Sequence, residues 1–268
     1  DTVDITLTQA LFNTGGALQA SGGLTVHADT LTNGTGQIKA LGSDALSLYI
    51  THGLSNAASG FIAGNGAVNL FAGSVVNAGQ IYTAGDLVVT SGGALDNRSG
   101  ALQAMGALAA TAAGALSNGN GRIEAGRGRS NATLSLTAAS LDNSAGRIAN
   151  AAQGATTLNL GSGALTNTGG TLGGQGDVAV SAGAIGNTGS GTVVAGRDLS
   201  LAATSLDNTI GSLYAARNLA WSNRLATLTN RSGHLGAGGN TVLALATLEN
   251  TGGETAARRW WAACCSPT

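Results

Sequence analysis

The sequence predicts an all-β protein: a parallel β-helix solenoid of about twelve coils, with three short strands in each coil. Two observations predict this fold. A Leu-x-Asn signal returns every 20 to 25 residues along the 268-residue chain, and apolar residues alternate with polar ones inside each repeat. The first pattern is typical of a solenoid, in which each repeat stacks only on its neighbours. The second is typical of short strands with one buried face.

The first element of each repeat is the Leu-x-Asn strand. Its apolar residue is Leu, Ile or Val and the next residue is mostly polar, so we expect the apolar side chain to face the inside. Asn tolerates the left-handed backbone of a corner and can satisfy local amides. Stacked Asn side chains of successive coils can form a hydrogen-bonded ladder. The predicted ladder consists of Asn13, Asn33, Asn56, Asn77, Asn97, Asn118, Asn143, Asn167, Asn187, Asn208, Asn230 and Asn250.

The second element follows the Asn as Asn-x-x-Gly-x-Ile/Leu-x-Ala, as in Asn97, Gly100 and Ala104. We expect the Gly to supply the positive φ that closes the turn, and the Ala to fit where the wall of the coil comes close. The third element is an apolar-x-apolar pair such as Leu87 and Val89. Both elements predict further strands with one face inward.

Other solenoids do not fit this repeat. A strand with a crossover helix needs about 30 residues, and the 44 glycines and the Gly/Ser/Thr spacers disfavour any helical segment. The unbroken period predicts one continuous β-helix domain over residues 1–254, with an insertion at residues 126–130.

The final residues differ from the repeats. Thr255 occupies a slot where Ile or Leu is expected, and both cysteines, the only proline, Trp260 and Trp261 follow it. We therefore expect residues 255–268 to be a non-repeat tail that leaves the coil path and is disordered or an artefact, such as a frameshift. The chain also opens within a repeat, at Ile5 and Leu7. We expect it to be a fragment of a longer protein.

The composition limits the classes of partner. Hydrophobic residues make up 43% of the chain and charged residues 9%, and the net charge is −1. This charge gives no reason to expect nucleic acid or an anionic membrane as a partner. No apolar run approaches 18 residues, and the N-terminus is not a basic segment followed by an apolar one, so we expect neither a membrane span nor a signal peptide.

Two units of the sequence carry a family resemblance. The stretches 95–104 (LDNRSGALQA) and 206–215 (LDNTIGSLYA), joined by the motif of residues 195–201 (AGRDLSL), resemble the repeats of filamentous haemagglutinins. The resemblance covers residues 5 to about 254. It implies a right-handed β-helix that forms the shaft of a large adhesin, secreted to the bacterial outer surface. Export would use a two-partner system with an outer-membrane β-barrel transporter, and the adhesin would bind an unidentified cell-surface receptor or glycan. Related shafts carry contact-dependent growth-inhibition toxins, so a toxin-delivery stalk is the alternative.

A more distant alternative is a polysaccharide-active β-helix enzyme. Such a site needs clustered carboxylates on adjacent coils. Asp96, Asp142 and Asp207 share one slot, but their coils are not neighbours. His27, His52 and His234 occupy unrelated slots and form no ligand set. We expect no enzymatic activity, no cofactor and no metal.

The strongest candidate surface is basic. Arg122 and Arg147 hold the same slot in consecutive coils, and Arg127 and Arg129 lie in the insertion between them. Because guanidinium groups suit sulfate and carboxylate, these four side chains are candidates for contact with a sulfated glycan or another anion. Glu124 would neutralise part of this charge, and a plain solvated face is the alternative.

The aromatic residues are few and scattered. Phe61, Phe71, Tyr214 and Trp221 are too sparse for a sugar-stacking platform. We expect them to fill the core.

Overall fold

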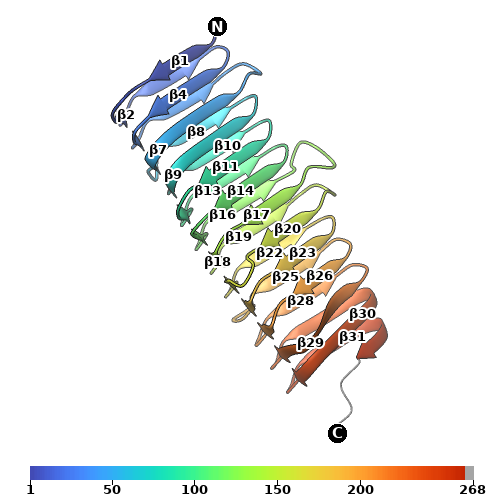
Figure 1. Cartoon of the computed structure of the whole chain (residues 1–268). Coiled ribbons are helices and arrows are strands. Elements are labelled where there is room, and N and C mark those ends of the chain that lie inside the picture. Colours follow the sequence, from blue (N-terminus) through green and yellow to red (C-terminus); the bar gives the residue numbers. More distant parts are fainter. Residues whose placement is uncertain (263–268) are drawn as a thin grey trace.

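The computed structural model describes residues 1–262, in which all the regular structure is β-strand. The strands wind into a rod of about twelve coils, with β1 (Val3–Thr6) and β31 (Glu254–Ala262) at opposite ends of the rod (Figure 1). Each strand pairs in parallel with the equivalent strand of a neighbouring coil, so the 31 strands found in residues 1–262 belong to one continuous sheet. The fold class predicted from the sequence is confirmed.

Each coil has three faces, here called A, B and C. Face A carries the apolar-x-apolar strands: β1 (Val3–Thr6), β4 (Leu24–Ala28), β7 (Leu46–Asn56), β9 (Val68–Asn77), β11 (Leu87–Ser91), β14 (Leu108–Ala112), β17 (Leu134–Thr137), β20 (Thr156–Asn159), β23 (Val178–Ser181), β26 (Leu199–Ala202), β29 (Leu219–Thr229), β30 (His234–Glu249) and β31 (Glu254–Ala262). Face B carries the Leu-x-Asn strands: β2 (Leu11–Phe12), β5 (Leu31–Asn33), β12 (Leu95–Asp96), β15 (Ala115–Ser117), β18 (Ser140–Asp142), β21 (Ala164–Thr166), β24 (Ala184–Gly186) and β27 (Ser205–Asp207). Face C carries the strands that follow the Asn: β3 (Ala17–Ala20), β6 (Gln37–Ala40), β8 (Phe61–Gly64), β10 (Gln80–Thr83), β13 (Ala101–Ala104), β16 (Arg122–Ala125), β19 (Arg147–Asn150), β22 (Thr171–Gly174), β25 (Thr192–Ala195) and β28 (Ser212–Ala215).

Some strands bend around a corner instead of breaking at it. Strands β7, β9 and β29 cover faces A and B in one piece, and β30 runs through all three faces. Strand β31 begins on face C and continues onto face A. Within each face their pairing is regular, and it shifts where the chain bends: once in β7, once in β29 and once where β30 pairs with β31. The three strands per coil are therefore present even where the chain is continuous.

The core is a set of straight inward columns. Leu95 pairs with Val75 in the preceding coil and with Leu116 in the following one, and all three are buried. The same holds in the interior of the rod, whereas Leu11 and Leu248 near its ends are partly buried, and the buried aliphatic residues form a single cluster. Removing an aliphatic side chain from water contributes about 1.5–3 kcal/mol. The alternation seen in the sequence is thus explained by burial.

The expected role of the repeat glycine is wrong. Positive φ occurs two residues after the Asn, at Ser99 (58°), Asn120 (55°) and Gly169 (62°) among others, and not at Gly100. The glycine is required for space: a Cβ on Gly100 would lie 2.0 Å from the backbone oxygen of Asn77 in the preceding coil. The repeat Asn is also not in the left-handed region. Its side chain has another role, described below.

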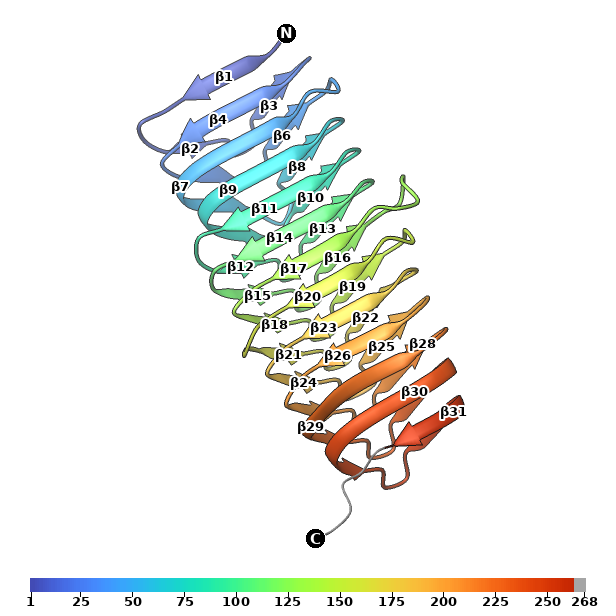
Figure 2. The ribbon, with the colours of Figure 1, turned by 45° about the vertical axis from the view of Figure 1, so that its right-hand side comes forward.

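The structure places the insertion and part of the tail. Residues 126–130 lie in the loop between β16 and β17, as expected, and Figure 2 shows this loop projecting from the rod. The expectation that the chain leaves the coil path after residue 255 is wrong for the described residues, because β31 continues to Ala262 and pairs in parallel with β30. Backbone hydrogen bonds to the preceding coil do not depend on the side-chain pattern that fails at Thr255. The part of the tail at residues 263–268 lies outside the described residues.

Across residues 1–262 the structure contains no helix with the length and apolar character needed to span a membrane.

Candidate functional surfaces

A buried ladder of Asn side chains runs along the corner between faces B and C. Each Nδ2 donates to the Oδ1 of the Asn in the next coil at 2.7–2.8 Å, in eleven consecutive bonds from Asn13 to Asn250. The same Nδ2 of Asn97 also reaches the backbone oxygen of Arg122 at 3.1 Å. From Asn33 to Asn230 the ladder residues are essentially inaccessible to solvent. Since these buried amides pair along the rod, each coil fixes the position of the next.

Three of the four candidate arginines converge on one buried carboxylate. Glu124 points outward from β16 on face C, yet only 2% of its surface is exposed. Arg122 and Arg147 donate to its Oε1 at 2.9 Å, and Arg127 donates to its Oε2 at 3.0 Å. Gln103 of the preceding coil donates to Oε2 as well, at 2.9 Å. We call Glu124 with these three arginines the arginine cluster.

The fourth arginine does not join the cluster. Arg129 lies 3.8 Å from Asp86 instead. The cluster therefore holds three positive charges against one negative charge. Its arginine side chains are each about half exposed, and a guanidinium group has five N–H donors, so each has donors beyond those that bind Glu124.

The electrostatics of Glu124 follow from this geometry. Burial raises the pKa of its carboxyl group, but hydrogen bonds from Gln103, Arg122 and Arg147 lower the pKa by more, so the net shift is downward. The carboxylate remains charged at neutral pH and holds the arginines in place.

A hollow lies beside the cluster on face C. The outward slots of the next two coils hold Ala149 and Gly173, which are too small to fill the space next to Glu124. The resulting depression has a volume of about 250 Å³ and is bordered by Arg127 and Arg147. Two cationic side chains thus face a space that a small anionic group can enter.

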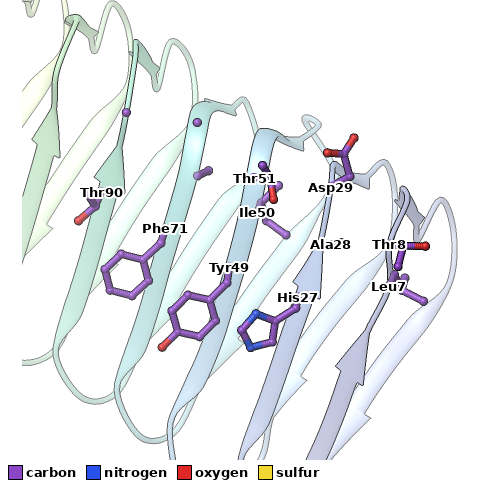
Figure 3. Close-up of a pocket in the computed structure, with 13 residues that line it drawn as sticks. Leu7, Thr8, His27, Ala28, Asp29, Tyr49, Ile50, Thr51, Phe71 and Thr90 are labelled. Atoms are coloured by element: carbon purple, nitrogen blue, oxygen red, sulfur yellow. The ribbon is translucent and has the colours of Figure 1, made fainter.

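A second surface lies on face A near the N-terminal end. The outward side chains of His27, Tyr49 and Phe71 occupy one slot in three consecutive coils, β4, β7 and β9. Their rings are stacked: the centroids of His27 and Tyr49 are 4.7 Å apart, and those of Tyr49 and Phe71 are 5.2 Å apart. Tyr49 is 41% exposed and Phe71 is 36% exposed. We call these three rings the aromatic row; Figure 3 shows them side by side across neighbouring strands.

An open groove of about 730 Å³ accompanies the aromatic row. It extends from Thr8 in the first coil to Gly92 in the fifth, and its polar border includes Asp29, Thr51 and Thr90. Asp29, on this border, forms a 2.6 Å pair with His52.

The scattered acids and histidines behave as surface groups. Asp177 and Asp198 each bind the arginine of the following coil, Arg197 and Arg217, at 2.8 and 2.6 Å. Hydrogen bonds from these arginines are the main reason that both pKa values are lowered. His234 pairs with Glu254 at 3.1 Å. In residues 1–262 no three His, Cys, Asp or Glu side chains are grouped so that they could hold a metal ion.

The haemagglutinin repeat model matches residues 1–48, 47–128, 171–220 and 219–259, well over half of the chain. The chain belongs to the haemagglutinin repeat family. These repeats and the β-helix fold together support the interpretation of the chain as an adhesin-like shaft segment. No curated protein and no solved structure matches the chain.

In the segment that the family model does not match, residues 129–170, the strands of this haemagglutinin-repeat chain still pair in the same register. Between residues 129 and 170, β17 to β21 pair with their neighbours without a shift. Two inward positions in this segment differ from those of the preceding coil. Asn150 occupies the slot of Ala125, and Thr156 occupies the slot of Leu134. Backbone pairing and the Asn ladder maintain the regular coil in this segment.

The prediction for the aromatic residues is only partly right. Trp221 fills the core, with Nε1 donating to the backbone oxygen of Ala203 at 3.2 Å. Phe71 and Tyr214 are exposed, and Phe61 is half-buried with the Lys39 ammonium 5.3 Å from its ring centroid. A signal for the aromatic row was present, because its three residues each follow the second residue of an apolar-x-apolar pair.

Proposed function

We propose that this chain is a shaft segment of a large bacterial adhesin that is secreted to the outer cell surface, and that it acts by structure and binding, without catalysis. The observation that carries the proposal is the Asn ladder, which runs unbroken from Asn13 to Asn250 inside one continuous sheet. A chain bonded in this way is a stiff spacer, because no coil can tilt without breaking buried bonds on both of its sides. Family membership supports the same role.

The export route in this proposal is two-partner secretion through an outer-membrane β-barrel transporter. Two properties of the chain support it. The sequence has no cysteine before Cys264, so most of the chain can cross a membrane unfolded without forming disulfides. Each coil also pairs only with its neighbours, so folding can proceed coil by coil as the chain emerges.

The test is antibody labelling of intact cells of the bacterium that makes the protein. An antibody raised against the projecting loop at residues 126–130 should label intact cells, and the labelling should be lost when the transporter gene is deleted. Labelling only after the cells are broken open would refute the proposal.

To separate an adhesin from a toxin-delivery stalk, deletion of the gene is followed by two assays: attachment to host cells, and competition against neighbouring bacteria. We expect attachment to fall; a loss confined to competition would favour the stalk.

We further propose that the arginine cluster contributes an anion contact, to a sulfated glycan or a similar group. Arg127 and Arg147 border the hollow next to Glu124, and the cluster carries an excess of positive charge. Arg122 supports their position through the shared carboxylate, and Arg129 has no part in this contact.

Retention on a heparin column measures this contact. The double variant Arg127→Ser/Arg147→Ser should elute at clearly lower salt than the wild type. Arg98→Ser is the matched control, because Arg98 is paired with Asp96 away from the hollow. Equal retention of both variants and the wild type would show that the cluster is only a solvated face.

A further inference from the structure

We infer that the groove beside the aromatic row binds an extended, neutral oligosaccharide that lies along the rod axis. This inference deepens the proposed adhesive function by naming a ligand class, but it stands on a different surface from the arginine cluster. The aromatic row is on face A in the second to fourth coils, whereas the cluster is on face C in the sixth and seventh.

The aromatic row is not required by the fold. In the coils that follow, the same outward slot holds Thr90, Thr111 and Thr137. These coils keep the same pairing without any ring. Three consecutive aromatic side chains in an otherwise small and polar column are therefore a local addition to the surface.

The composition of the groove fits a sugar. The exposed parts of the stacked rings offer apolar area against which the C–H groups of a pyranose ring can pack. The border supplies hydrogen-bond partners for hydroxyl groups: the hydroxyls of Thr51 and Thr90, the Tyr49 hydroxyl, and the Asp29 carboxylate. Within residues 1–262, Asp29 uses Oδ1 toward His52, and its Oδ2 has no hydrogen-bond partner.

The charge of the groove selects a neutral ligand. Asp29 is the one acidic residue that lines it, and no Lys or Arg lines it within the described part of the chain. A sulfated or uronic-acid chain would be repelled by the carboxylate and would find no guanidinium to bind. Anionic and neutral ligands are thus assigned to two separate surfaces.

The repeat of the rod fits the repeat of such a ligand. Strands of neighbouring coils are about 4.8 Å apart, which is close to the length of one pyranose unit in a straight, β-linked chain. The groove passes over five coils, so successive sugar units would meet successive rungs of one outward column. An α-linked chain curves away from such a straight line of contacts.

The experiment titrates cellohexaose, a straight β-linked glucose oligomer, into the purified full chain, with maltohexaose, its curved α-linked isomer, as the matched ligand. Binding is followed by isothermal titration calorimetry, and saturation-transfer NMR reports which sugar protons touch aromatic rings. We expect saturable binding of cellohexaose, at least tenfold tighter than that of maltohexaose. No saturable binding, or equal binding of the two sugars, would overturn the inference.

Variants place the ligand on the groove. Tyr49→Thr copies the residue found in later coils, and Asp29→Asn keeps the shape of the border; each should weaken cellohexaose binding about tenfold or more. Tyr214→Thr is the control, because this exposed tyrosine lies on face C outside the groove. Circular dichroism checks that each variant is folded, and a folded Tyr49→Thr with unchanged affinity would refute the assignment. Cell-surface labelling and sugar binding are independent measurements, so failure of one leaves the other standing.

Discussion

Removing one rung of the Asn ladder should destabilise the rod far more than removing an ordinary surface Asn. In Asn97→Ala two short bonds disappear: the one that Asn97 Nδ2 donates to Asn118 Oδ1, and the one that Asn77 Nδ2 donates to Asn97 Oδ1, each 2.7 Å long. After the change Asn118 Oδ1 has no donor, whereas Asn77 Nδ2 keeps the backbone oxygen of Ala101 at 3.1 Å. One buried polar group left without a partner costs about 1–3 kcal/mol.

The lost contacts and the small space left by the amide add to that cost, so the expected loss in free energy of unfolding is about 2–5 kcal/mol. The measurement is equilibrium urea denaturation followed by far-ultraviolet circular dichroism, with the shift in midpoint as the quantity compared. Asn159→Ala is the control, because Asn159 is exposed and accepts one hydrogen bond, from the backbone N–H of Gly161. It should change stability by less than about 0.5 kcal/mol. If Asn97→Ala and Asn159→Ala shifted the midpoint equally, the ladder would not be a stabilising element.

Three further predictions concern the corner, the core and the arginine cluster. Gly100→Ala should lower the free energy of unfolding by about 3 kcal/mol or more, because the added Cβ would lie 2.0 Å from a backbone oxygen. Ser99→Gly, at the position with φ of 58°, should leave it unchanged. If urea denaturation showed Ser99→Gly to be the more destabilising change, the positive-φ role of Gly100 would be restored. Thr156→Val should raise the free energy of unfolding by about 1 kcal/mol, since the buried Oγ1 of Thr156 has no hydrogen-bond partner. Thr157→Val is the control and should be neutral, because Thr157 is exposed. A destabilised Thr156→Val would mean that the Thr156 hydroxyl is hydrogen-bonded in the folded protein. The pKa of Glu124 is lowered in the folded state, so its stabilising contribution is complete above the unfolded value of about 4.3 and is lost as the pH falls through the lower folded value. Thermal denaturation in acid should therefore show a loss of stability in the wild type that Glu124→Gln lacks, and parallel pH profiles would contradict the role of this carboxylate.

The fold could be predicted because each coil repeats the constraint of the one before it. Leu95 packs between Val75 and Leu116 in the same slot, so one misplaced side chain would disturb two neighbours. This constraint appears in the sequence as the regular spacing of apolar residues. The reason for the corner glycine could not be predicted in the same way. A glycine needed for positive φ and a glycine needed for space look alike in a sequence, and only the 2.0 Å approach to Asn77 distinguishes them.

The candidate surfaces were harder to predict because side-chain length decides them. Register placed Arg122 beside Arg147, but it could not show that Arg127 reaches back to Glu124 while Arg129 reaches Asp86 instead. These choices depend on the path of the insertion, which has no counterpart in the other coils. The continuation of the coil beyond Thr255 could not be predicted for the opposite reason: pairing of backbone groups continues through β31 although the apolar pattern has stopped.

Inward and outward columns are therefore under different constraints. An inward slot must be filled in every coil, because a gap would expose the neighbours above and below it. An outward slot faces water, and its residue can change from His27 through Phe71 to Thr90 without altering the pairing. A ligand that lies along the rod contacts one outward column over several coils, so the unit that carries binding is a run of a few equivalent positions and not a single coil. Such a rod can present different binding surfaces along its length while its interior remains the same.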